Sequence, residues 1–453
     1  MYSDIQNKFL SFGKDSKPKN NIQDIFLSYC KKTINNEENI IQPNLTNQDS
    51  TYKYPVENTK IIVKDKIKNN KLSDLNILET EIVKNLLSVE YPEQRSKQWF
   101  EQRDGAITAS DGGCVIGVNK YEPSYKFIMK KVFREPFLGG KDCYNGKKHE
   151  DTAILIYEYK YNVIIEEFGL VKHPKYSFLA ASPDGIVGKY KSDNKHLTNL
   201  VGRMVEIKCP TRRQIQTTGE IKGNICPIYY WVQVQLQLEC CNLDKCDFWQ
   251  CQILEYDCRS DFIADTDNIN NFKSIETGME KGCLIQLLPK NKYKEFVDEN
   301  NNFNSKKYYE TVYEHTKFIY PTKIEMSPYD CDMWVMETLE KLQTDENYDN
   351  YNFDRVIYWK LVKFHNSLIV RDTDWFKQHL PIYEYMWQIV EYYRKNDNEA
   401  QIIKKYIEYK SYKKDYKELA LLGKTFMQLF EDVYKDKNKA KKILDKLEIE
   451  MYN

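Results

Sequence analysis

The sequence predicts an α/β fold: a mixed sheet flanked by helices, with a polar arm before it and a mostly helical region after it. Residues 1–75 are polar, rich in Asn and Lys and poor in periodic apolar pattern, which is typical of a partly disordered segment. Residues 76–300 combine helix-period segments with short apolar runs, which favours one compact α/β domain. Residues 301–453 carry apolar residues at helical spacing, so we expect mostly helices there.

Individual elements follow from the residue patterns. In the central region, helices are predicted over Ser124–Phe133 and Gly146–Tyr159. Strands are predicted over Val163–Val171, Phe178–Ala181, Met204–Lys208 and Phe248–Glu255. We expect Gly282 to break the chain before the apolar run Cys283–Leu288. In the C-terminal region, helices are predicted over Trp334–Leu342, Trp375–Lys395 and Glu399–Glu448.

Composition limits the class of protein. The chain has 453 residues, of which 41% are hydrophobic, enough to bury a sizeable core. Its 67 basic and 67 acidic residues balance, which argues mildly against a protein that coats DNA but is compatible with one local basic groove. The sequence has no apolar run of the ~18–20 residues that a membrane span needs, and no signal peptide is evident at Met1–Lys14. We therefore expect an intracellular protein without a membrane partner.

The 12 cysteines are expected to be mostly reduced, because oxidised scaffolds are usually short chains with small cores. The densest group contains no Cys-x-x-Cys pair, so buried structural thiols are favoured over a metal or iron–sulfur site. This group consists of Cys240, Cys241, Cys246, Cys251 and Cys258.

The segment Val205-Glu206-Ile207-Lys208 carries the first chemical signal. Side chains two positions apart share a face of a strand, so Glu206 and Lys208 should project together while Val205 and Ile207 face the core. Alone this pattern is weak, because it also describes a surface ion pair worth less than ~1 kcal/mol.

Upstream, Pro183 and Gly185 bracket Asp184 in a turn after an apolar strand. Asp-Gly is also an ordinary turn pair. Asp184 and Glu206 lie on segments that suit two adjacent strands joined by a polar loop, so their carboxylates could converge. Two carboxylates beside a lysine suit Mg²⁺, which prefers oxygen ligands, keeps several waters and binds phosphate.

Two further segments complete a series. Glu150 opens a helical stretch and offers another carboxylate, although by itself it is an ordinary surface acid. In Tyr229–Leu238, apolar residues alternate with Gln, a pattern that predicts a strand.

The order of these motifs is specific. Trp99–Ser110 comes first, followed by Gly146…Glu150, Ser182-Pro183-Asp184-Gly185, Glu206-Ile207-Lys208-Cys209-Pro210 and Gln233-Val234-Gln235. This order resembles the YqaJ-like viral recombinase family, which includes the lambda-type exonucleases of the PD-(D/E)XK nuclease superfamily, over roughly Tyr91–Tyr256. The Lys- and Asn-rich flanks resemble a version from a large DNA virus. The resemblance implies a PD-(D/E)XK restriction-endonuclease-like core, and places the protein in a host cytoplasm or a virion.

The resemblance also implies roles for single residues. Asp184, Glu206 and the Ile207 main-chain carbonyl would bind Mg²⁺, with Mn²⁺ as a substitute. Lys208 would position the attacking water. Glu150 would support the metal site and Gln233 would orient it, which requires Gln233 on a helix, against the strand that its alternation predicts. Arg103 and Ser110 match positions that hold a 5′-phosphate, for which an arginine fork is chemically suited.

Basic residues near these motifs predict a DNA path. Lys147, Lys148, Arg212 and Arg213 are the main candidates, and the flanking residues Lys126, Lys130, Lys131 and Arg134 extend the set. The alternative is a solvated charged face. The expected function is a metal-dependent DNA nuclease, with 5′-exonuclease action in viral recombination, repair or DNA degradation favoured. An endonuclease on the same core, or a catalytically idle DNA-end-binding scaffold, stays open.

A short repeat lies in the N-terminal arm. Ile5–Phe12 recurs as Ile22–Tyr29 with Gln, Phe, Leu, Ser and a final aromatic at equal spacing. Such segments could dock a recombination or replication protein through a short helix. The alternatives are a chance similarity, or helices that pack on the protein itself. A homo-oligomer is a further expectation.

Overall fold

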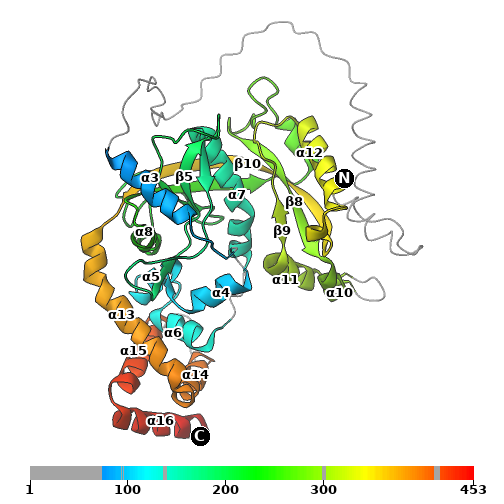
Figure 1. The fold of residues 1–453 in the computed structure, drawn as a ribbon. Helices are drawn as coiled ribbons and strands as arrows, with labels where there is room; N and C mark the ends of the chain where they lie inside the picture. The colour runs from blue at the N-terminus through cyan, green and yellow to red at the C-terminus, as the bar shows by residue number, and fades with distance from the viewer. Residues whose placement is uncertain are drawn as a thin grey trace, which may run out of the picture. The chain divides into compact units, whose positions relative to one another are not determined.

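The computed structural model describes residues 74–92, 94, 96–135, 140–297, 303–412 and 419–452. The N-terminal repeat and nearly all of the polar arm lie outside these residues. The chain forms two compact units. One combines Leu78–Leu254 with Leu361–Asn453, and the other contains Glu255–Lys360. Each is described separately below (Figure 1).

The first unit contains all the predicted site residues. Its helices are α3 (Asp74–Leu87), α4 (Lys97–Asp104), α5 (Gly112–Val115), α6 (Ser124–Phe133), α7 (Lys141–Tyr161), α8 (Ile228–Cys241), α13 (Thr373–Lys395), α14 (Asp397–Tyr412), α15 (Leu419–Lys435) and α16 (Lys437–Tyr452). Its strands are β1 (Ile107–Thr108), β2 (Val163–Glu166), β3 (Val171–Lys172), β4 (Leu179–Ala181), β5 (Gly185–Tyr190), β6 (Met204–Lys208) and β7 (Lys245–Glu255).

The sheet of this unit is mixed. Its strands follow the order β2-β5-β6-β7, and a small separate sheet has the order β1-β4-β3. Strands β5 and β6 are antiparallel, with Gly185 opposite Val205. Strands β6 and β7 are parallel, with Lys208 opposite Gln250. Helix α7 packs against β2 and β6, and α8 packs against β4. The predicted α/β class with a mixed sheet flanked by helices is therefore confirmed.

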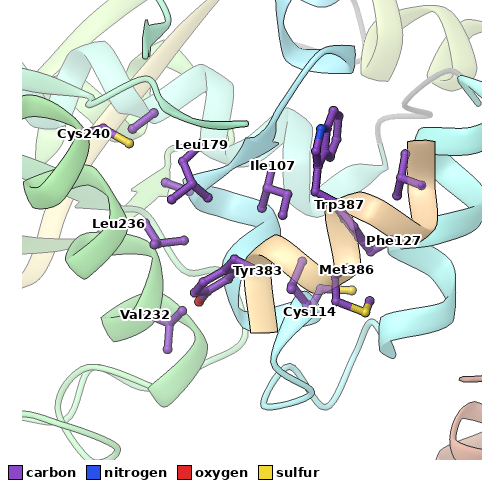
Figure 2. Close-up of a cluster of buried hydrophobic side chains, with 14 of the residues drawn as sticks. Ile107, Cys114, Phe127, Leu179, Val232, Leu236, Cys240, Tyr383, Met386 and Trp387 are labelled. Carbon is purple, nitrogen blue, oxygen red and sulfur yellow. The ribbon is translucent and has the colours of Figure 1, made fainter. Parts of the chain in front are cut away.

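A large apolar core holds these elements together. It joins α6, α8 and the strand β4 to the C-terminal helix α13. Figure 2 shows part of it: Tyr383, Met386 and Trp387 of α13 lie near Ile107 and Phe127. Burial of such side chains is worth roughly 1.5–3 kcal/mol each, so α13 contributes strongly to the stability of the unit that carries the site.

The second unit has its own sheet and core. It contains α9 (Arg259–Ala264), β8 (Lys281–Pro289), α10 (Tyr293–Phe296), α11 (Ser305–His315), β9 (Lys317–Ile319), α12 (Pro328–Leu342) and the first half of β10 (Tyr351–Val370). Strand β8 pairs with β10 on one side and with β9 on the other, antiparallel in both cases. The apolar residues of α12 pack in this unit's core.

Three local predictions are wrong. Val163–Val171 is not one strand, because β2 ends at Glu166 and β3 begins at Val171 in a separate sheet. Tyr229–Leu238 is part of helix α8, not a strand, as the family resemblance implied. Gly282 does not break the chain, because it lies within β8 opposite Trp359. A Cβ at position 282 would lie 2.9 Å from Cζ2 of Trp359, so glycine makes room for the indole.

The region after residue 300 is less uniformly helical than expected. The predicted helices are present, but β9 and the 20-residue strand β10 are found there too. No helix in the described part of the chain is long and apolar enough to cross a membrane. Four of the clustered cysteines, Cys240, Cys241, Cys246 and Cys251, are buried free thiols, as predicted, and Cys258 is half-buried.

Candidate active site

Glu206 lies at the centre of β6, where strand alternation places it on the same face as Lys208. Its side chain is 0% exposed, so the alternative of a surface ion pair is wrong. The Glu206 Oε1 atom accepts hydrogen bonds from Lys208 Nζ and, at 2.7 Å, from Gln233 Nε2. Its Oε2 atom accepts a bond of 2.7 Å from Gln237 Nε2. The carboxylate is therefore held on both oxygens.

Asp184 lies in the turn that leads into β5. Its Oδ2 atom accepts a hydrogen bond of 2.7 Å from the main-chain N–H of Ile207, which ties the turn to β6. Gly185 is required beside it, because a Cβ at that position would overlap the Cγ2 methyl of Ile165. Desolvation and the nearby Glu206 and Glu150 carboxylates raise the pKa of Asp184 well above its ordinary value.

Glu150 reaches this region from helix α7. Hydrogen bonds link the helix to Cys209, just after β6. Asn145 Nδ2 donates to the Cys209 carbonyl oxygen at 3.2 Å, and Cys209 Sγ lies 3.5 Å from the His149 carbonyl oxygen. Helix α7 thus adds a third carboxylate to the two that the strands provide.

The charges of this group do not balance. Lys208 carries the positive charge that faces the Asp184 and Glu206 carboxylates, and the Glu150 carboxylate acts on Asp184 as well. Burial lowers the pKa of Lys208, but the Glu206 and Asp184 carboxylates more than offset this, and the pKa ends above its ordinary value. Lys208 therefore stays protonated, with its Nζ 4.8 Å from the centre of the Tyr230 ring.

An excess of carboxylate oxygens suits a hard divalent cation. The Oε1 atom of Gln237 is buried without a hydrogen-bond partner, one more oxygen at this site whose bonding is incomplete. Among the described residues, no three His, Cys, Asp or Glu side chains are placed to hold a metal ion together. Main-chain, water or substrate oxygens must therefore complete any coordination shell, which is how Mg²⁺ is usually bound.

Arg103 lies on helix α4. This helix begins after Ser96, and the Ser96 side chain caps it by accepting a hydrogen bond from Trp99 N. The guanidinium Nη2 donates to Thr108 Oγ1 at 3.3 Å and to Ser110 Oγ at 3.2 Å. It also stacks on Trp99, with 4.4 Å between Cζ and the ring centre. The predicted pair of Arg103 and Ser110 is therefore in direct contact.

Trp99 links this pair to the carboxylates. Its Nε1 donates to Ser182 Oγ at 3.2 Å, two residues before Asp184 in the chain. The arginine fork and the Asp184 turn are thus held by one short series of contacts.

Asp111 forms a second charged group near Arg103, which the sequence did not reveal. It pairs with Lys130 at 2.9 Å and with Lys131 at 3.0 Å. Burial raises the pKa of Asp111, but Lys131, Lys130, Arg103 and the hydrogen bond from Thr108 together bring it well below its ordinary value. Asp111 is therefore ionised and paired with basic side chains within the protein.

The remaining basic candidates lie in different settings. Lys148 and Lys131 are buried, so neither presents a free ammonium at the surface. Arg213 is partly buried and donates to Gln250 Oε1 at 2.7 Å. Arg212 is largely exposed, 3.9 Å from Asp142. Lys147 is half-buried, and the flanking Lys126 and Arg134 are exposed.

Four contributors were not among the predicted site residues: Gln237, Ser182, Tyr230 and Trp99. Gln237 follows Gln233 by one helical turn, so a helix reading of this segment places both amides on one face. The roles of Ser182 and Tyr230 depend on contacts across the fold, for which the sequence carries no local signal.

Comparison with known proteins identifies the region. Residues 98–244, which contain every site residue named in the prediction, match the family described as the YqaJ-like viral recombinase domain. The chain carries a YqaJ-like viral recombinase domain. The predicted resemblance is confirmed, and its viral context is supported by a relative from Acanthamoeba polyphaga mimivirus.

That relative, uncharacterized protein R354, is 36% identical to the chain over 317 residues, 70% of this chain and 56% of R354. The chain thus spans just over half the length of the relative that it matches. Among solved structures, an alkaline exonuclease from Laribacter hongkongensis, LHK-Exo, is 22% identical with a TM-score of 0.27. LHK-Exo in complex with dAMP is 23% identical with the same TM-score of 0.27. Each match covers 35% of this chain and 74% of the other chain.

Proposed function

We propose that the protein is a divalent-metal-dependent deoxyribonuclease that degrades DNA from 5′ ends. The observation that carries this proposal is the fully buried Glu206, which shares one face of β6 with Lys208 and is tied through Ile207 to Asp184, inside a YqaJ-like domain. Burying several carboxylates around a single lysine lowers the stability of the fold, because one positive charge cannot compensate all of them. A site for a cation and a phosphate explains that cost.

Each residue has a defined part in the proposed reaction. Asp184, Glu206 and the Ile207 carbonyl would hold Mg²⁺, or Mn²⁺ in its place, and the bound ion would supply a lowered water pKa and neutralise phosphate charge. Lys208, kept protonated by its carboxylate neighbours, orients the attacking water and stabilises charge on the phosphate. Gln233 and Gln237 fix the Glu206 carboxylate, and Glu150 supports the site from α7.

Arg103 and Ser110 account for the preference for an end. Their contact and the stacking on Trp99 preorganise an arginine fork, which suits a terminal phosphate because that group has three non-bridging oxygens and more negative charge than an internal phosphodiester. The Trp99–Ser182 hydrogen bond then fixes this fork relative to Asp184. Among the surface basic residues, Lys147, Arg212 and Arg213 are the candidates for contacts along the DNA backbone.

The test uses linear and circular duplex DNA with Mg²⁺, and linear duplex labelled at either the 5′ or the 3′ end. Degradation of linear DNA alone, with early release of the 5′ label, is the expected result. Cleavage of circular DNA at a similar rate would instead show an endonuclease. Binding to DNA ends without any cleavage would show a recombination scaffold.

A further inference from the structure

A row of tyrosine rings connects Lys208 with the surface of the YqaJ-like domain. Tyr230 lies under the Lys208 ammonium, and its ring centre is 4.4 Å from that of Tyr229. Tyr229 in turn meets Tyr121 edge-to-face, with ring centres 5.9 Å apart and an angle of 87°. Tyr121 is 67% exposed. The row therefore begins at the proposed reaction centre and ends in solvent.

The backbone holds this row in place. Tyr229 and Tyr230 lie in the first turn of α8. Tyr229 packs closely on Gly113: a Cβ added at position 113 would lie 2.9 Å from the Cβ of Tyr229. The Gly113 carbonyl oxygen accepts from Val118 N at 2.9 Å, at the start of the loop that carries Tyr121. Asn119 Oδ1 accepts from Tyr121 N at 3.0 Å. The exposed ring is thus presented by an anchored turn.

The chemistry of the exposed end suits a nucleotide. The Lys120 ammonium lies 5.0 Å from the centre of the Tyr121 ring, so a cation stands beside a flat apolar surface. Aromatic rings with an adjacent cation are the usual surface for unpaired bases, and they accept any base because every base has a π-face.

We propose that the exposed ring of Tyr121, held edge-to-face against Tyr229, forms a stacking platform for an unpaired base at the DNA end, with Lys120 on the adjoining phosphate. The proposal rests on the proposed function, since the row leads away from the lysine that would act on the scissile phosphate. It extends that function by naming the form of substrate that the site holds, which is a frayed or single-stranded end.

The test measures binding of the full chain to duplex DNA that carries an unpaired terminal 2-aminopurine, with Ca²⁺ in place of Mg²⁺ and DNA integrity checked on gels. Stacking quenches the fluorescence of this base. Tyr121→Leu should lose the quenching and bind about tenfold more weakly, because one base–aromatic contact is removed. Tyr121→Phe should behave as the unchanged protein, since the ring is retained.

A matched control is Tyr412→Leu, which removes a tyrosine that is 92% exposed on α14 and should change neither signal. A second DNA, with an abasic site in place of the terminal base, completes a double-mutant cycle. The unchanged protein should bind the abasic DNA as weakly as the Tyr121→Leu variant binds the DNA with the terminal 2-aminopurine. Equal losses for Tyr121→Leu on both DNAs, or no loss on either, would overturn the platform.

Cleavage of linear DNA with Mg²⁺ is measured separately, so the two proposals can fail independently. Base-dependent binding through Tyr121 without any cleavage contradicts only the proposed function. Cleavage that proceeds while Tyr121→Leu binds with full affinity and full quenching contradicts only the platform.

Discussion

Asp111 and Glu206 are both buried carboxylates of the same unit, but their surroundings differ in charge. Asp111 is 3% exposed and faces Lys130, Lys131 and Arg103, which bring its pKa well below the ordinary value. Glu206 is fully buried and shares a single lysine with Asp184, whose pKa is raised well above the ordinary value. In the first group the carboxylate is fully paired with basic side chains, as in a structural ion pair. The second leaves negative charge unmatched, as in a site that takes up a cation.

The largest effect is expected at Asp111, the carboxylate that is paired with basic side chains. Asp111→Asn keeps the shape of the side chain but leaves Lys131 buried without its counterion, so the free energy of unfolding should fall by about 3–5 kcal/mol at neutral pH. The sign follows from the lowered pKa: ionised Asp111 stabilises the fold above its unfolded-state pKa of about 4, and this contribution is lost as the pH falls. Urea unfolding at several pH values should show the gap between the two proteins narrowing below about pH 4.

The exposed acid Asp193 provides the control for this measurement. Asp193→Asn should change stability little, because this exposed side chain accepts from Lys195 N and His196 N through one oxygen, which asparagine can also provide. Equal stability of the Asp111→Asn variant and the unchanged protein at neutral pH would mean that the ion pairs of Asp111 contribute nothing to folding.

Substitution in the Asp184–Glu206–Lys208 group should lower the rate of DNA cleavage more than the stability of the protein. Lys208→Ala removes the only lysine near Glu206 in the described site, and the rate of DNA cleavage should fall by about 10²–10³-fold, the loss typical of one preorganised electrostatic contact. The melting temperature should change far less than in Asp111→Asn. Lys191→Ala, which breaks a lysine–carboxylate pair with Glu158 elsewhere in the unit, should cleave at the normal rate. A normal rate for Lys208→Ala would remove Lys208 from the mechanism.

The smallest expected effect is the stabilisation of the protein by Mg²⁺, which tests directly whether the Asp184–Glu206 group and not Asp111 binds the ion. Mg²⁺ should raise the melting temperature of the protein by a few degrees, because binding to the folded state alone stabilises it. Asp184→Asn should lose this rise, since the unmatched charge is reduced, whereas Asp111→Asn should keep it despite its lower starting temperature. A rise of equal size in Asp184→Asn, measured by thermal unfolding with and without EDTA, would place the ion elsewhere.

Local pattern was sufficient for the elements that carry the metal-binding residues. Helix α6 and strand β6 have the bounds that the sequence predicts, because their apolar residues repeat with a single clear period. The adjacency of β5 and β6 followed from the polar loop between Asp184 and Glu206. The motif order then placed Gln233 on a helix, where periodicity alone predicted a strand.

The failures share a physical cause, which is that long-range partners bury polar groups. Gln235 and Gln237 are buried in α8 because they bond Val370 O and Glu206, far away in the chain, so their alternation does not mark a solvent face. Lys131 resembles a DNA contact until Asp111 is seen beside it. Gly282 resembles a chain break until Trp359 is seen across the strand.

Gly185 has a consequence for how such a protein changes over generations. Replacing Asp184 by asparagine would remove a charge from the site and keep an oxygen that can accept from Ile207 N, whereas any side chain at position 185 would collide with Ile165 of the neighbouring strand. Selection for folding alone therefore keeps the glycine, and selection for chemistry keeps the aspartate. In a descendant that had lost catalysis, the residue at position 184 would vary while the glycine at position 185 would be retained. Comparing these two positions among related sequences therefore shows whether selection for catalysis still acts.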